Sequence, residues 1–284
     1  MTLIEVLKLS SAHLHKHGSD SPRLDAELLL AKALGLRRLD LYLKFDHPLS
    51  ERELSACRTL VARRARGEPV AYLVGHKEFM GLDFELTPAV LVPNPDTEVL
   101  VQRAVAIARG EERPIRVADV GTGSGCIAIA IAHYASNTEV WASDISPEAL
   151  EVAGRNIALH GLAGRVHLVC GDLLSPLAGS FDLLCANLPY LSPASPLARE
   201  VLAQPPGALY ADAGGSELVC RMIDEAPAKL APGGHVLAEV DVAILPAVSA
   251  AVDRRFGDHR LHRDLGGHER VLEIWSARTA GSEG

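Results

Sequence analysis

The stretch Asp119-Val120-Gly121-Thr122-Gly123-Ser124-Gly125 joins the end of an apolar run to a loop that contains three glycines. The residues before it, Arg116–Val120, have the composition of a buried strand, and Ile127–Tyr134 after it that of a buried helix. From Ile115 onward, strand-like and helical runs alternate along the chain. This alternation predicts an α/β fold with a mostly parallel, doubly wound sheet and helices on both faces.

The other segments of this region follow the same alternation. The expected strands after Arg116–Val120 are Glu139–Ser143, Val166–Cys170, Phe181–Ala186, His235–Val240 and Arg270–Trp275. The expected helices between them include Ile127–Tyr134, Pro147–His160 and Leu218–Leu230. In such sheets a ligand binds beyond the carboxyl ends of the strands, so we expect a site there.

The glycine loop is suited to a cofactor, because glycine lets the backbone turn tightly and approach a ligand closely. Its spacing is GxGxG, which differs from the GxGxxG of dinucleotide-binding loops. Asp119 would repel a pyrophosphate, whereas a zwitterionic ligand with an amino group tolerates an acid there better. The residues predicted to bind the cofactor in this loop are Gly121, Thr122, Gly123, Ser124 and Gly125.

Two further acids follow expected strands. Asp144 closes the second strand, where a carboxylate can accept hydrogen bonds from both hydroxyls of a ribose. Asp172 follows the third strand and can accept from an adenine amino group, while Leu173 can pack on the ring. Each acid alone also fits a turn or a helix cap. Together with the glycine loop they fit S-adenosylmethionine best.

The motif Asn187-Leu188-Pro189-Tyr190 follows the expected strand Phe181–Ala186. The Asn187 side-chain oxygen and the Leu188 carbonyl are hydrogen-bond acceptors, since Pro189 cannot extend a ladder, and Tyr190 offers a flat ring. Such a group suits a planar –NH2, as in a carboxamide or an adenine. A simple turn is the alternative. The motif and the cofactor loop together predict methyl transfer to a planar nitrogen, with Asn187, Leu188, Pro189 and Tyr190 as the catalytic residues.

The chain also divides by composition. Residues 1–70 show helix signals, such as Ser21-Pro22 before a helix and the capping pair Ser50 and Glu53. Residues 71–95 contain short β-prone runs, including Ala71–Val74 and Val90–Val92, and predict a linker hairpin. Residues 96–284 form the expected catalytic domain, with Thr97 as a helix cap. The first part is expected to be a small helical domain that recognises the substrate.

The composition narrows the possible partners. A net charge of −8 argues against a protein that coats nucleic acid. The five cysteines form no CxxC pair, which indicates reduced thiols and no zinc site. His13 and His17 would share a helix face, but no acid or cysteine completes a metal site. No apolar run reaches the length of about 18 residues that a membrane span needs, so the cytoplasm is the expected compartment.

Several motifs resemble those of the N5-glutamine methyltransferases that modify peptide chain release factors. They span nearly the whole chain: Ser21–Leu30, Gly67–Tyr72, Val90–Glu98, Asn187–Tyr190 and Asp264–Arg270. The resemblance implies a class I, Rossmann-like S-adenosylmethionine-dependent methyltransferase domain behind a small N-terminal helical domain. It also implies that Gly121–Gly125, Asp144, Leu173 and Asn187 line the cofactor site, and that Asn187–Tyr190 hold the substrate glutamine of a Gly-Gly-Gln loop. Leu188 and Asn94 depart from the usual proline and arginine of that family.

Two other functions use the same residues. An N6-adenine methyltransferase of RNA or DNA would hold its base by the same –NH2 contacts, with Tyr190 stacking on a flipped base. The acidic net charge and the N-terminal motifs argue against nucleic acid as substrate. An inactive S-adenosylmethionine-binding assembly factor is the second alternative, and the intact Asn187, Pro189 and Tyr190 argue against it.

Overall fold

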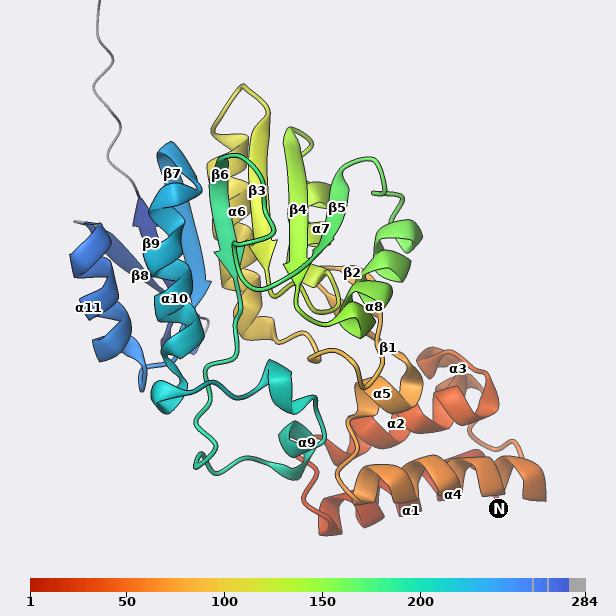
Figure 1. Cartoon of the computed structure of the whole chain (residues 1–284). Coiled ribbons are helices and arrows are strands. Elements are labelled where there is room, and N and C mark those ends of the chain that lie inside the picture. The colour runs from red at the N-terminus through yellow and green to blue at the C-terminus, as the bar shows by residue number, and fades with distance from the viewer. Residues whose placement is uncertain (257, 265, 276–284) are drawn as a thin grey trace, which may run out of the picture. The chain divides into compact units, whose positions relative to one another are not determined.

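The computed structural model describes residues 1–256, 258–264 and 266–275, so Leu265 of the C-terminal motif and residues 276–284 of the expected catalytic domain lie outside the described residues. The chain forms two compact units. The first contains Met1–His76 and Pro196–Gln204, and the second contains Lys77–Ser195 and the described residues from Pro205 onward. Each unit has its own elements, which are labelled in Figure 1.

The first unit is helical. Its helices are α1 (Leu3–Lys16), α2 (Pro22–Leu34), α3 (Arg38–Leu43), α4 (Glu51–Ala65), α5 (Val70–Val74) and α9 (Arg199–Leu202). They enclose an apolar core to which α1, α2 and α4 contribute most of the side chains. Arg64 is buried in this unit and bonds Asp25 at 2.7 Å and Glu200 at 2.6 Å, which ties α9 to α2 and α4. The capping box expected at Ser50 and Glu53 is present.

The second unit is built on a seven-stranded sheet with the order β5-β4-β3-β6-β7-β9-β8. The strands are β3 (Ile115–Val120), β4 (Thr138–Asp144), β5 (Val166–Cys170), β6 (Phe181–Ala186), β7 (Leu230–Glu239), β8 (His259–Arg263) and β9 (Glu269–Trp275). Strands β3 to β7 are parallel, whereas β9 runs antiparallel to β7 and β8 antiparallel to β9. The predicted α/β fold is therefore confirmed.

Helices cover both faces of this sheet (Figure 1). They are α6 (Glu98–Arg109), α7 (Cys126–Tyr134), α8 (Pro147–Leu159), α10 (Glu217–Glu225) and α11 (Leu245–Arg255), with 3-10 turns at Pro95–Thr97, Pro206–Ala208, Ala213–Gly215 and Ala226–Ala228. Buried side chains of α10 and α11 pack with one face of β3, β6 and β7. In Figure 1, α10 lies in front of the sheet and α6 behind it.

Three local predictions are wrong. Ala71–Val74 was expected to be extended but lies in helix α5, because Val70, Leu73 and Val74 are buried at helical spacing and Gly75 ends the helix in the left-handed conformation. Val90–Val92 forms no strand, and the hairpin consists of β1 (His76–Phe79) and β2 (Leu82–Glu85) instead. Strand β8 was missed because its sequence, His259–Arg263, is charged, as edge strands often are.

The core of the sheet gives a prediction for stability. Leu184 is fully buried at the centre of β6, so Leu184→Ala should lower the free energy of unfolding by about 2–5 kcal/mol through lost contacts and a cavity. Urea unfolding followed by tryptophan fluorescence reports on this unit, since both tryptophans, Trp141 and Trp275, lie in it. The control Leu159→Ala, at a residue 56% exposed, should change it by less than about 0.5 kcal/mol. Equal losses in the two variants would contradict this account of the core.

Candidate active site

The register of the parallel strands brings several loops to one level. Val120 of β3 is paired with Ser143 of β4 and with Ala186 of β6, and Ala186 is paired in turn with Ala238 of β7. The next residue along each strand therefore lies at the same edge of the sheet. These neighbouring residues are Gly121, Asp144, Asn187 and Glu239.

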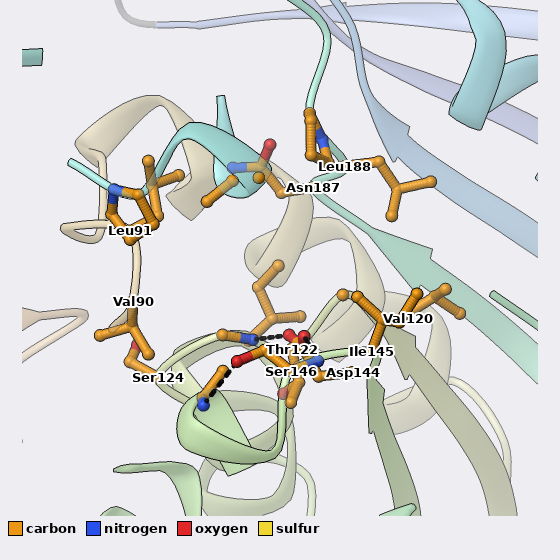
Figure 2. Close-up of a pocket in the computed structure, with 18 of the residues that line it drawn as sticks. Val90, Leu91, Val120, Thr122, Ser124, Asp144, Ile145, Ser146, Asn187 and Leu188 are labelled. Atoms are coloured by element: carbon orange, nitrogen blue, oxygen red, sulfur yellow. Dashed lines mark hydrogen bonds between the residues drawn. The ribbon is translucent and has the colours of Figure 1, made fainter. Parts of the chain in front are cut away.

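The loops beyond this edge surround a pocket of about 500 Å³ (Figure 2). The pocket is lined by ten residues predicted from the sequence: Gly121, Thr122, Gly123, Ser124, Asp144, Asp172, Leu173, Asn187, Leu188 and Pro189. Neither Gly125 nor Tyr190 is among its lining residues. It is also lined by residues that the sequence did not single out for this site, including Val90, Leu91, Thr97, Ala208 and Arg221. In Figure 2, Val90 and Leu91 lie across the pocket from Val120.

The glycine loop approaches the Asn187–Tyr190 motif closely. Gly121 has a φ of 72°, and a Cβ built on it would lie 2.9 Å from the Leu188 side chain. The backbone N–H groups of Gly121 and Thr122 both donate to the Ser143 carbonyl, at 2.8 and 2.9 Å. Glycine at 121 is therefore needed both for the turn and for the packing of Leu188 beside it.

Asp119 lies beneath the loop and is fully buried. Its Oδ2 accepts hydrogen bonds from the Thr122 hydroxyl at 2.6 Å and from the Ala128 backbone N–H at 3.1 Å. Its Oδ1 has no partner in the described part of the chain. Burial raises the pKa of Asp119 to about 7, and the nearby Asp144 raises it further, although the two hydrogen bonds oppose this. A buried acceptor of this kind can bind a donor brought by a ligand.

Asp144 lies at the end of β4, between the glycine loop and the start of α8. One carboxylate oxygen accepts from the Gly123 backbone N–H at 2.9 Å, and the other from the Ser146 N–H at 2.9 Å. These bonds fix the side chain at the pocket wall, as Figure 2 shows. Since each carboxylate oxygen can accept more than one hydrogen bond, Asp144 can still accept from ligand hydroxyls.

Asp172 lines the pocket together with Arg221 of α10, which the sequence did not indicate. Arg221 donates to Asp172 Oδ2 at 2.5 Å, so one oxygen of this acid is engaged by a cation. The other oxygen is left for a ligand donor. Leu173 beside it has a φ of 46°, and its carbonyl accepts from the Ser143 hydroxyl at 3.3 Å.

Asn187 is held by a chain of buried polar groups. Its side-chain Nδ2 donates to the Thr97 hydroxyl at 3.0 Å, and Thr97 donates to Glu239 at 2.6 Å. Thr97 was expected to cap a helix, and it is the N-cap residue of α6, but its side chain makes no capping bond. Across the described residues, no hydrogen bond reaches the Asn187 Oδ1 or the Leu188 carbonyl. Two acceptors at the pocket are therefore available to a ligand.

Tyr190 takes a different position from the flat plate expected beside the acceptors. Its hydroxyl donates to Glu239 at 3.3 Å, and its ring packs against the core between the sheet and α10 and α11. Burial raises the pKa of the Tyr190 hydroxyl above its ordinary value, and the charge of Glu239 adds to this effect. Burial also raises the pKa of Glu239 to about 7, against the hydrogen bonds from Thr97 and Tyr190. The signal for Glu239 in the sequence is an acid that closes a buried apolar run.

Comparisons with known proteins agree with this arrangement. Family models of the PrmC N-terminal domain and the methyltransferase small domain match residues 5–75 and 95–268. The release factor glutamine methyltransferases of Rhodopirellula baltica and Geobacter sulfurreducens are 38% and 40% identical to this chain, with 97% and 95% of both chains covered. A methyltransferase from Pyrococcus furiosus shares the fold, with a TM-score of 0.54 at 21% identity, over 76% of this chain and 98% of that one.

The sheet, the glycine loop and the matched domain define this protein as a methyltransferase. The N-terminal match and the extent of the similarity then separate it from other methyltransferases. The chain belongs to the release factor glutamine methyltransferase family. The family indicated by the sequence motifs is thus confirmed. In the described ranges, no helix is long and apolar enough to pass through a bilayer.

Gly215 provides a test of how the motif is held. It has a φ of 101°, and a Cβ there would lie 2.0 Å from the Tyr190 carbonyl oxygen. Gly215→Ala should therefore displace the motif and lower both the melting temperature and the rate of methyl transfer. The control is Gly214→Ala, since Gly214 has a φ of 71° but no atom within 4 Å of a built Cβ. It should cost only the backbone strain of about 1–2 kcal/mol. Equal effects on the rate would contradict the steric explanation.

Proposed function

We propose that this protein methylates the N5 amide nitrogen of the glutamine in the Gly-Gly-Gln motif of peptide chain release factors, with S-adenosylmethionine as the methyl donor. The observation that carries the proposal is the pair of available acceptors at the pocket, the Asn187 Oδ1 and the Leu188 carbonyl. Membership of the release factor glutamine methyltransferase family supports the same substrate.

The residues at the strand ends fit S-adenosylmethionine. The unpaired Asp119 Oδ1 suits the donor of an amino group, and the raised pKa of this acid shows what ionisation costs without a cation nearby. Asp144 is placed to accept from ribose hydroxyls, and Asp172 and Leu173 lie where an adenine can be held. When bound, this cofactor supplies an electrophilic methyl group.

The substrate nitrogen needs help from the protein, because the lone pair of a carboxamide is delocalised into its carbonyl. Asn187 Oδ1 and the Leu188 carbonyl would accept the two N–H groups and hold the nitrogen with its lone pair toward the methyl group. As the nitrogen becomes positive, both hydrogen bonds strengthen, so they stabilise the transition state more than the ground state. Gly121 supports this geometry by letting Leu188 pack against the cofactor loop.

The first unit, Met1–His76 with Pro196–Gln204, is proposed to contribute to recognition of the release factor. A pocket for one cofactor and one side chain is formed wholly by residues of the second unit, so methyl transfer itself does not require a second folded unit. Contacts far from the reacting amide can supply binding energy that positions one glutamine among many. A short Gly-Gly-Gln peptide is therefore expected to react much more slowly than an intact release factor.

N6-adenine methylation is less well supported. The net charge of −8 disfavours binding to nucleic acid, and Tyr190 is tied to Glu239 rather than placed at the pocket wall for base stacking. An inactive assembly factor is disfavoured by the acceptors that remain available at Asn187 and Leu188.

The assignment of Asp144 predicts a loss of cofactor affinity. Asp144→Ala should weaken binding of S-adenosylmethionine by about 1.5–3 kcal/mol, since ribose hydroxyls would lose hydrogen bonds to a charged acceptor. Isothermal titration calorimetry measures this loss. The matched control is Glu148→Ala, which removes an exposed acid from the first turn of the same helix, α8, and should leave the affinity nearly unchanged. Equal affinities for wild type and Asp144→Ala would disprove the ribose assignment.

The substrate is tested with labelled cofactor and three acceptors offered separately: a release factor, the same factor with Gly-Gly-Gln changed to Gly-Gly-Glu, and RNA. Only the first should take up the methyl group, because a carboxylate has no N–H to donate and is repelled by two oxygen acceptors. Mass spectrometry should place the added methyl on the glutamine amide. Label that appears on RNA adenine and never on the protein would overturn the proposal.

A further inference from the structure

The further inference concerns the direction in which the Asn187 carboxamide points, and it rests on the proposed function. We infer that Thr97 and Glu239 are positioning residues, which fix the Asn187 side chain with its oxygen toward the substrate and thereby select an –NH2 group over a carbonyl or carboxylate. Thr97 is 2% exposed and Glu239 is 1% exposed, so both act from beneath the pocket wall.

The direction of each hydrogen bond follows from the groups involved. An ionised carboxylate can only accept, so Glu239 requires the hydroxyl of Thr97 to donate to it, at 2.6 Å. A hydroxyl has one proton, so the Thr97 oxygen can then only accept from Asn187, at 3.0 Å. The group on Asn187 that faces Thr97 must therefore be the –NH2, and Oδ1 is left for the substrate.

The opposite orientation would damage the site. If the Asn187 amide rotated by half a turn, its oxygen would face the Thr97 oxygen, whose proton is already bound to Glu239. Its –NH2 would meet the –NH2 of the substrate, where two donors repel each other. The same rotated amide would instead suit a carbonyl or carboxylate oxygen. The order Glu239–Thr97–Asn187 is thus a specificity determinant as well as a support.

The ionisation of Glu239 controls this order, so the groups around it matter. Tyr190 follows β6 and donates to the second oxygen of Glu239. Asp96, next to Thr97, raises the pKa of Glu239, whereas Arg270 of β9 lowers it. The charge of Arg270 is shared with Asp96, Asp241 and Asp264, at 3.4, 3.4 and 3.0 Å. Cys126 of α7 also feels the charge of Glu239, but burial raises the pKa of its thiol to about 12, so it stays neutral.

The pKa of Glu239, about 7, predicts a pH dependence. Above this pH the carboxylate is ionised and the order of donors holds. Below it Glu239 carries a proton and can donate to Thr97, whose own proton is then free to turn toward Asn187 and favour the rotated amide. We expect kcat to fall as the pH falls through about 7. Asp119 has a similarly raised pKa, so the profile is measured at saturating cofactor and compared with Glu239→Gln, in which this acidic fall should disappear.

The central variant is Thr97→Val, which keeps the shape of the side chain and removes only its hydroxyl. Helix α6 loses no capping bond, because Thr97 makes none. With an intact release factor, kcat should fall by about 10- to 100-fold, as expected for a reacting group held less precisely. The KM for S-adenosylmethionine should stay near that of the wild type, since the residues at the cofactor loop are unchanged. Thr97→Ser restores the hydroxyl and should restore most of the rate.

Specificity gives a second measurement that simple destabilisation would not change. The Gly-Gly-Glu release factor should inhibit Thr97→Val more strongly, relative to the Gly-Gly-Gln factor, than it inhibits the wild type. Tryptophan fluorescence checks that each variant is folded. A wild-type kcat in Thr97→Val, a Thr97→Ser variant as slow as Thr97→Val, or an acidic fall retained in Glu239→Gln would each overturn the inference. A wild-type enzyme that transfers no methyl group to the release factor would instead overturn the proposed function.

Discussion

The parallel pairing of β3 with β4 and β6, and of β6 with β7, is the constraint on which the rest of the site depends. Backbone hydrogen bonds hold these strands in a single register, so that Gly121, Asp144, Asn187 and Glu239 emerge at one edge. A shift of one residue in any strand would turn its buried side chains to the opposite face of the sheet. The apolar core on each face therefore specifies the register, and the register in turn places the polar groups.

Two buried carboxylates lie just behind this edge, and burial alone would disfavour the charge of each. Asp119 and Glu239 are held in different ways. Asp119 keeps one oxygen unpaired, which leaves it open to a ligand donor, while Glu239 uses both oxygens for Thr97 and Tyr190. One acid is thus suited to binding and the other to positioning, although burial raises both pKa values to about 7.

The Asn187–Tyr190 motif is fixed along its whole length. Asn187 is bonded to Thr97, Leu188 packs on Gly121, and Tyr190 is bonded to Glu239. Just beyond it, Leu191 exchanges backbone hydrogen bonds with Leu209 and Ala211, at 2.9 and 3.1 Å. Acceptors that are held this firmly need little reorganisation when a substrate amide binds, which is how preorganised polar groups lower a reaction barrier.

The sequence by itself determined the α/β fold, the glycine loop and the polar motif after β6, because apolar periodicity and glycine or proline signals are local properties of the chain. It did not reveal helix α5 or strand β8, whose residues adopt their conformations through packing and pairing with distant segments. It assigned Thr97 to a helix cap and gave Glu239 no role. Only the tertiary structure joined Thr97, Asn187 and Glu239, since these residues come from three separate elements and a hydrogen bond across 90 or 142 positions leaves no local pattern in the sequence.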